Sequence, residues 1–116
     1  MPEPEDARAA LAGARESAVA RLASLEREFG GIVEAAQGAS TDDEHDPEGA
    51  TLAFERQHVA ALAQAAREHL ADIDAAVARL ADGSYGTCQA CGQPIGAERL
   101  AARPAARTCI ACTRRR

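Results

Sequence analysis

Apolar residues recur at heptad spacing along two long stretches of this chain, and that spacing most constrains its fold. The first stretch has them at Leu11, Ala18, Leu22, Leu25, Phe29, Ile32 and Ala36. The second has them at Leu52, Val59, Leu62, Ala66, Leu70, Ile73, Val77 and Leu80. Such a stripe lies on one face of a helix, where a partner helix covers it. We expect a structural coiled coil of two helices, over residues 5 to 37 and 47 to 82.

The helix ends carry their own signals. Pro4 followed by Glu5 is typical of a first helical turn, and Asp46 before Pro47 predicts an N-cap and first residue of the second helix. Gly83 suits the left-handed conformation that often follows a helix. Each helix would be about 50 Å long. Because only a short break separates them, the helices must lie antiparallel, as a long hairpin.

Three residues interrupt the first seam. Arg15 stands near its start, and Gly30 and Gly31 each destabilise a helix by about 1 kcal/mol relative to alanine. We still expect one helix to residue 37, with the glycines as the place for a bend. Alanine supplies most of the 47% apolar residues, and aromatic residues are only 3%. That composition favours an elongated helix pair over a rounded core, because small side chains let helices approach closely.

Charge divides the chain unevenly. Residues 1–82 hold 17 acids and seven arginines, whereas residues 83–116 hold six arginines against Glu98 alone. An acidic arm disfavours non-specific binding to nucleic acid. The absence of lysine and asparagine beside abundant alanine and arginine indicates a GC-rich, hence bacterial, genome. The N-terminus lacks signal-peptide features and no long apolar run exists, so we expect a cytoplasmic protein with no membrane contact.

Two cysteine pairs, with the spacing Cys88-x₂-Cys91-x₁₇-Cys109-x₂-Cys112, follow the helices. This spacing is typical of four-cysteine zinc sites, and in a reducing cytoplasm it favours metal binding over disulfides. Gly92 would allow a tight turn in which backbone N–H groups point at sulfur. Four thiolates close a tetrahedron around one Zn²⁺ and leave no position for water, so the predicted site is structural rather than catalytic. A single iron and a pair of redox motifs remain alternatives.

The break between the helices is acidic. Its residues, within the predicted tip at 38–50, are Asp42, Asp43, Glu44, Asp46 and Glu48, followed by Ala50. A calcium loop is not expected, because Pro47 stands where such a loop needs its sharp glycine turn. The histidines at 45, 58 and 69 lie outside the cysteine spacing and are predicted at the surface or beside the seams. We therefore divide the chain into a helical hairpin, residues 1–82, and a zinc-finger module, residues 83–116.

A DNA-binding finger is one alternative for this module. Residues 96–103 could form a short helix with Arg99 and Arg103 on one face, and the terminal arginines 114–116 could touch phosphate. Base-reading helices also use asparagine and glutamine, whereas no amide or aromatic residue accompanies these arginines and the hairpin attached to them is acidic. We do not expect sequence-specific DNA binding.

The pattern G-x-Y-G-x-C-x-x-C-G-x-x-I-x-x-x-R-L-x-A-x-P-x-A-x-x-C-x-x-C over residues 83–112 resembles the zinc finger of the DksA/TraR family. The resemblance implies a transcription regulator, not an enzyme, that binds RNA polymerase, core or holoenzyme, and inserts its coiled-coil tip into the secondary channel. In DksA-like members the tip pattern is D-x-x-D-x-A. Counting back from Cys88 places His45, Glu48 and Ala50 there, while Asp43 and Asp46 fit its first part.

Besides the tip pattern, the end of the sequence also differs from that of DksA-like members. DksA-like members continue into a further helix that helps clasp the polymerase and bind guanosine tetraphosphate, whereas here four residues follow Cys112. The nearby part of the second helix is acidic at Glu68, Asp72 and Asp74. The resemblance therefore leaves a response to guanosine tetraphosphate open. The alternative to a polymerase-binding regulator is a zinc-capped coiled-coil scaffold that dimerises or docks elsewhere.

Overall fold

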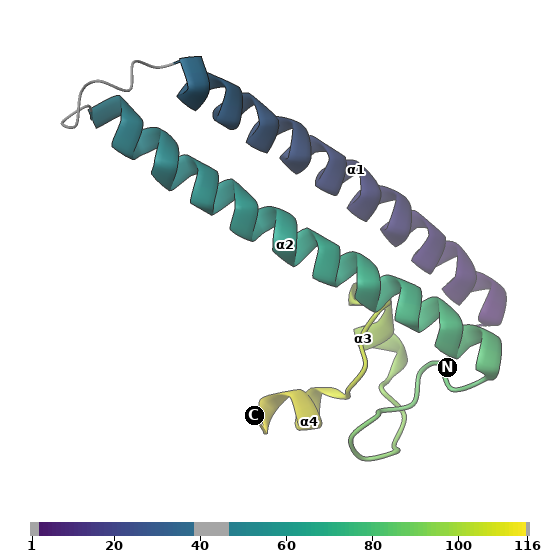
Figure 1. Ribbon diagram of the computed structural model, residues 1–116. Coiled ribbons are helices and arrows are strands. Elements are labelled where there is room, and N and C mark those ends of the chain that lie inside the picture. Colours follow the sequence, from purple (N-terminus) through teal and green to yellow (C-terminus); the bar gives the residue numbers. More distant parts are fainter. Residues whose placement is uncertain (1–2, 39–46, 116) are drawn as a thin grey trace. The chain divides into compact units, whose positions relative to one another are not determined.

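The computed structural model describes residues 3–38 and 47–115, which form four helices (Figure 1). α1 spans Pro4–Gly38 and α2 spans Pro47–Asp82, whereas α3 (Ala97–Ala102) and α4 (Ile110–Arg114) are short. Across this described part, β-structure is limited to an isolated antiparallel bridge between Thr87 and Pro94. The predicted fold class, a mainly α chain with a long antiparallel hairpin before a four-cysteine module, is confirmed. None of the described helices is long and apolar enough to span a bilayer.

α1 begins as its sequence predicts. The N–H of Ala7 donates to the carbonyl of Glu3 at 2.9 Å, and the acids at positions 5 and 6 occupy the first turn. Acidic side chains there are stabilised by the positive end of the helix dipole. The helix then runs through Gly30 and Gly31 to Gly38, so the two glycines do not end it.

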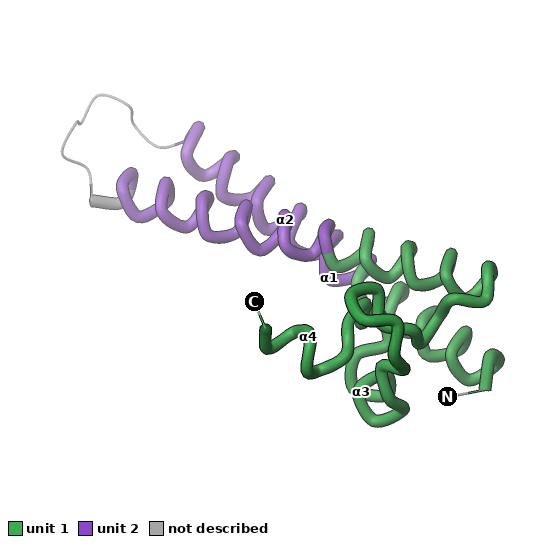
Figure 2. The backbone as a smooth tube through the Cα atoms, turned by 90° about the horizontal axis from the view of Figure 1, so that it is seen from below, with its two compact units in different colours: residues 1–18, 69–116 green, residues 19–68 purple. Residues whose placement is uncertain are grey.

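The contacts within the chain define two compact units (Figure 2). Unit 2 consists of residues 19–68, where the two long helices pack antiparallel through Leu25 on α1 and Val59, Ala63 and Ala66 on α2. Half-buried Leu22, Phe29, Ile32 and Leu62 surround this cluster. The predicted seam is thus confirmed in unit 2, with Ala63 as an unpredicted member. The division of the chain into a hairpin, residues 1–82, and a zinc-finger module, residues 83–116, stays a prediction.

Unit 1 combines residues 1–18 with residues 69–116. On α1 its buried residues are Ala7, Leu11 and Ala18, with Ala14 half-buried beside them. Ala7 and Ala14 stand 18 residues before Leu25 and Ile32, which is five turns of a straight helix. Because a straight helix drifts from a strict heptad, the seam passes through Ala14, and Arg15 remains exposed in an ion pair with Asp74 at 2.8 Å. The expected interruption at Arg15 was wrong.

The seam of α2 also differs from its prediction in unit 1. Ile73 and Ala76 are fully buried, whereas Val77 is 43% exposed and was wrongly assigned to the seam. The reason is that α2 here packs against the tail as well as against α1. Tail residues Tyr85, Ile95 and Leu100 join the same buried cluster, and this second contact moves the covered face toward Ala76.

The chain leaves α2 through a glycine turn. Gly83 has φ of +87°, as predicted, and the N–H of Ser84 donates to the carbonyl of Arg79 and to Oδ1 of Asp82, each at 2.9 Å. These bonds satisfy groups that a helix end leaves open. The expected short helix after Gly96 is α3, and its Leu100 is buried.

Candidate metal centre

Cys88 and Cys91 lie on a tight turn closed by backbone hydrogen bonds. The N–H of Gly92 donates to the carbonyl of Cys88 at 2.9 Å, and the N–H of Cys88 donates to the carbonyl of Gln93 at 2.8 Å. Gly92 has φ of +77°, a conformation in which a Cβ is strained. The glycine turn predicted after the first cysteine pair is confirmed.

The second pair sits at the start of α4. Cys109 is the N-cap residue, Cys112 lies within the helix, and the N–H of Thr113 donates to the carbonyl of Cys109 at 3.0 Å. One backbone bond joins the two halves, because the N–H of Gln89 donates to the carbonyl of Arg107 at 2.9 Å. The loop of the first pair is thereby fixed to the segment that leads into the second.

The four sulfurs come together as the spacing predicts. All lie within 4.8 Å of one another, and Sγ of Cys91 is 3.8 Å from Sγ of Cys109. A tetrahedral zinc site with Zn–S bonds of about 2.3 Å has sulfurs about 3.8 Å apart. The cluster therefore fits Zn²⁺. His58 and His69 are exposed, as predicted, and take no part in it.

Backbone groups stabilise negative charge at this cluster. N–H groups from both pairs, led by that of Cys109, point at Sγ of Cys88 and lower the pKa of its thiol to about 6. The pKa of Cys112 is raised to about 12, first because its thiol is hydrogen-bonded to Cys109. Four such thiols cannot all ionise unless a cation balances the charge, and a divalent metal supplies it.

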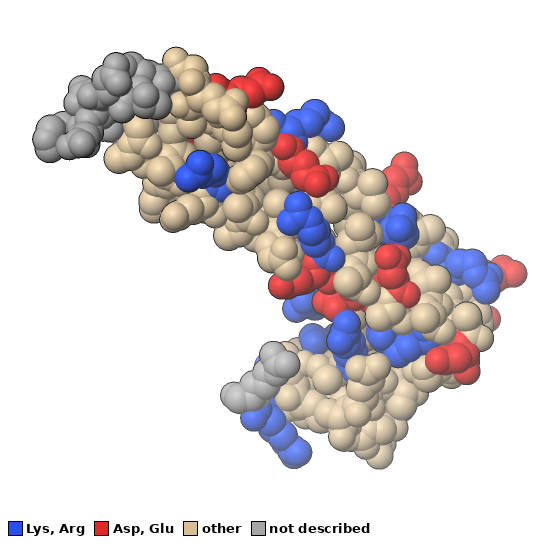
Figure 3. Space-filling view, viewed as in Figure 1, with Lys and Arg blue, Asp and Glu red and all other residues tan. Residues whose placement is uncertain are grey.

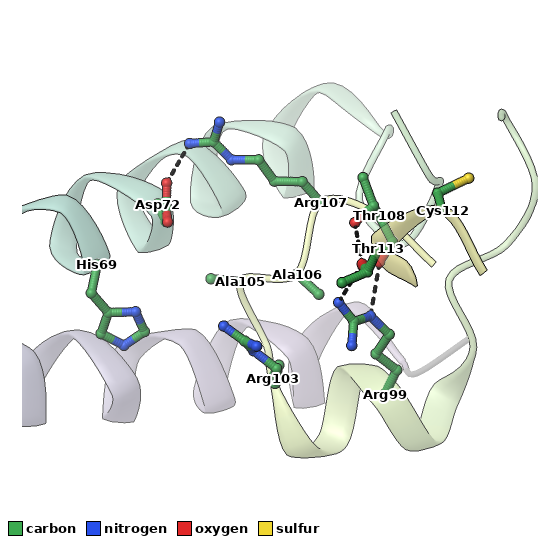
Figure 4. Close-up of a pocket in the computed structure, with 10 residues that line it drawn as sticks. All are labelled: His69, Asp72, Arg99, Arg103, Ala105, Ala106, Arg107, Thr108, Cys112 and Thr113. Atoms are coloured by element: carbon green, nitrogen blue, oxygen red, sulfur yellow. Dashed lines mark hydrogen bonds and ion pairs between the residues drawn. The ribbon is translucent and has the colours of Figure 1, made fainter. Parts of the chain in front are cut away.

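A basic hollow lies beside the second pair. Its volume is about 380 Å³, and its lining includes Arg99, Arg103 and Arg107 from the tail with His69 and Asp72 from α2 (Figure 4). Arg107 is paired with Asp72, and Arg99 is hydrogen-bonded to Thr108 and Thr113. Arg99 is therefore committed within the tail and is not available to read base edges.

Arg79 is a residue whose role the sequence did not reveal. It is 8% exposed, its Nη2 donates to the carbonyl of Ala106 at 3.4 Å, and burial lowers its pKa. With the Arg107–Asp72 pair it holds residues 106 and 107 against α2. Only its place one helical turn before Gly83 could have suggested a contact with the tail.

The predicted tip falls mostly outside the described residues. This is so for Asp42, Asp43, Glu44 and Asp46, and also for His45. Glu48 and Ala50 lie in the first turn of α2, and Ala50 is exposed. Outside the tip, acidic residues and arginines are interspersed along the helices (Figure 3). Residues 83–115 hold five arginines and a single acid.

Comparison with known proteins begins with the tail. Residues 83–116 match the family described as the prokaryotic dksA/traR C4-type zinc finger. The uncharacterized protein YteA of Bacillus subtilis is 41% identical over 69 residues, which are 60% of this chain and 29% of YteA. The RNA polymerase-binding transcription factor DksA of Caulobacter vibrioides is 52% identical over 40 residues, 34% of this chain and 28% of that protein. The chain thus spans less than a third of the length of these two relatives.

A solved structure extends the similarity beyond the tail. Transcription factor DksA2 from Pseudomonas aeruginosa is 34% identical and superposes with a TM-score of 0.77, covering 97% of this chain and 81% of that one. The C4-type finger and the clustered cysteines give this chain one structural zinc ion as its cofactor. Similar in sequence and fold over nearly its whole length, the chain belongs to the DksA/TraR family.

Proposed function

We propose that this protein regulates transcription by binding RNA polymerase, core or holoenzyme, in the cytoplasm, and that it catalyses no reaction. The observation that carries the proposal is its 34% identity, over 97% of its length, to a transcription factor. The tail supports it further, since 40 residues are 52% identical to a factor named for polymerase binding. Sequence-specific contact with DNA is not part of the proposal, because Arg99 is engaged within the tail.

In this proposal the zinc ligands are the four sulfurs of Cys88, Cys91, Cys109 and Cys112, and residues 83–116 act as the base of the molecule. The distances between these sulfurs fit tetrahedral coordination of one zinc ion. The base would hold residues 1–82 as a probe. Tyr85, Ile95 and Leu100 support this role, since they are buried in one cluster with Leu11 of α1 and with α2.

The finer part of the proposal is entry of the tip into the secondary channel of the polymerase. The tip residues would be Asp42, Asp43, Glu44, Asp46, Glu48 and Ala50. Carboxylates suit a position near the catalytic magnesium and the mobile elements around it, because they interact with divalent cations and basic side chains. Their acidic character is the feature of this sequence that supports channel entry.

Binding to purified core polymerase tests the proposal, with a known secondary-channel protein as competitor. We expect the protein to bind the polymerase and the competitor to displace it. Binding that it leaves unchanged would move the contact away from the channel while keeping the partner. No binding to core or holoenzyme would favour the scaffold alternative. A shift assay on duplex DNA at physiological salt should show no specific complex.

A further inference from the structure

The guanidinium of Arg99 is hydrogen-bonded to the residues on both sides of the second cysteine pair (Figure 4). Its Nε donates to the carbonyl of Thr108 at 2.8 Å, and its Nη2 donates to Oγ1 of Thr113 at 3.1 Å. Thr108 is the residue before Cys109, and Thr113 is the residue after Cys112. One planar group thus holds both ends of the segment that carries two of the four thiols.

The hydroxyl of Thr113 completes this arrangement. It lies 2.7 Å from Oγ1 of Thr108 and 3.1 Å from the carbonyl of Cys109. A hydroxyl has one proton and two lone pairs. It can therefore accept from Arg99 and from Thr108 while donating to Cys109, which uses its proton and both lone pairs. The network ends on the backbone of a cysteine.

Arg103 provides the contrast. It stands just after α3, one turn beyond Arg99, carries the same charge and is exposed. Among the described residues its side chain makes no hydrogen bond or ion pair, although it lines the same hollow. Of these two arginines that line the hollow, only Arg99 is hydrogen-bonded to the segment that carries the second cysteine pair.

We propose that Arg99 is a positioning residue for the zinc site, which holds Cys109 and Cys112 at the separation that the ion requires. Groups behind the ligands orient them, and their loss typically lowers metal affinity about 10-fold to 100-fold. The proposal rests on the ligand assignment proposed above and is independent of polymerase binding. It assigns to the R of the R-L-x-A pattern a duty inside the finger.

We expect that lysine at position 99 cannot take over the positioning role of Arg99. The Nε and Nη2 donors lie on one edge of a rigid plane and reach two acceptors at once, whereas an ammonium is a single point on a flexible stem. If Arg99 acted only by its charge near the thiolates, lysine would serve as well. The comparison of Arg99→Lys with Arg99→Ala therefore separates positioning from charge.

Zinc transfer to a chromophoric chelator tests the proposal, on full-length protein loaded with one equivalent of zinc. We expect Arg99→Ala to lower apparent zinc affinity about 10-fold or more, with Arg103→Ala within about twofold of the parent. Arg99→Lys should resemble Arg99→Ala. The cobalt-loaded proteins should show altered thiolate-to-metal absorption in Arg99→Ala and an unaltered spectrum in Arg103→Ala.

Thr113→Val keeps the test sharp should Arg99→Ala fail to fold. It removes one acceptor of Arg99 and should lower zinc affinity below that of Arg103→Ala, a comparison that does not need Arg99→Ala. Where Arg99→Ala folds, Thr113→Val should weaken zinc binding by less, and the variant with both changes should lose less than the two single losses combined. Equal affinity of the Arg99 and Arg103 variants, or full rescue by lysine, would overturn the proposal. Cys109→Ser is measured alongside: zinc retained there would refute the ligand assignment instead.

Discussion

The phenol of Tyr85 donates a hydrogen bond of 2.8 Å to the carbonyl of Pro104, joining the segment that leaves α2 to the segment that leads into α4. Tyr85 is 5% exposed and lies in the cluster that contains Leu11 and Ile73. One side chain therefore links the helical core of unit 1 with both halves of the finger. This position makes Tyr85 a reporter of tail docking.

The titration of Tyr85 should reveal that docking. Burial raises the pKa of its phenol above 10.0, because desolvation disfavours the phenolate. A raised pKa stabilises the folded tail fully below pH 10, and the stabilisation is lost as the pH rises through the folded value. Since this is the chain's sole tyrosine and there is no tryptophan, tyrosinate absorbance reports on it alone. We expect a midpoint above that of the urea-unfolded chain; coincident midpoints would contradict the buried position.

A pair of substitutions on α2 tests the corrected seam. Ile73 is fully buried and Val77 is 43% exposed, although both fit the heptad spacing. Ile73→Ala should lower the free energy of unfolding by roughly 2–5 kcal/mol, because it leaves a cavity. Val77→Ala should change it little, within about 0.5 kcal/mol. Thermal unfolding followed by circular dichroism measures both, and similar losses would restore Val77 to the core.

The sequence was sufficient to assign buried positions where large apolar side chains recur on one face of a helix. Leu25 and Ile73 were assigned correctly from spacing alone, and the four thiols were grouped by a spacing that favours a metal site. Alanine gave no such signal. Ala14 and Ala76 lie in or beside the core, yet other alanines of the described helices, such as Ala12 and Ala65, are exposed.

Roles that depend on tertiary packing could not be predicted. Arg99 was considered as a DNA contact because, from the local sequence, an arginine on a short helix is typical of a DNA-reading residue. Its actual partners, Thr108 and Thr113, are set by the fold of the loop between α3 and α4. Burial of Arg79 follows likewise from the position of Ala106, which no helical periodicity encodes.

Replacement of a second-pair cysteine tests the cofactor directly. Cys109→Ser should abolish stoichiometric zinc and unfold the tail, because metal binding supplies folding energy to a segment of this size. Much of the helicity of α1 and α2 should remain. Ala111→Ser is the control, since it adds a hydroxyl at an exposed position of α4 without removing a thiol. Elemental analysis measures the metal; a parent protein without stoichiometric zinc would contradict the site.

The acidic tip is where function should separate from stability. The triple variant Asp43→Asn, Asp46→Asn and Glu48→Gln removes charge while keeping side-chain size, and asparagine preserves the capping ability of position 46. We expect polymerase affinity within a few-fold of the parent, because the proposed base provides most of the binding. The effect on transcription in vitro should be lost, because the tip is proposed to act near the catalytic magnesium.

A matched triple variant excludes a general effect of charge. Glu28, Glu34 and Glu55 are exposed on the helices of unit 2, and no side-chain hydrogen bond or ion pair is found for them among the described residues. Changing these three to glutamine alters net charge equally and should leave both binding and regulation as in the parent. Loss of regulation in the tip variant alone then assigns the activity to the tip. A tip variant that binds and regulates like the parent would reduce the acidic run to a solvated turn, and the site of action would have to lie on the helices or the finger.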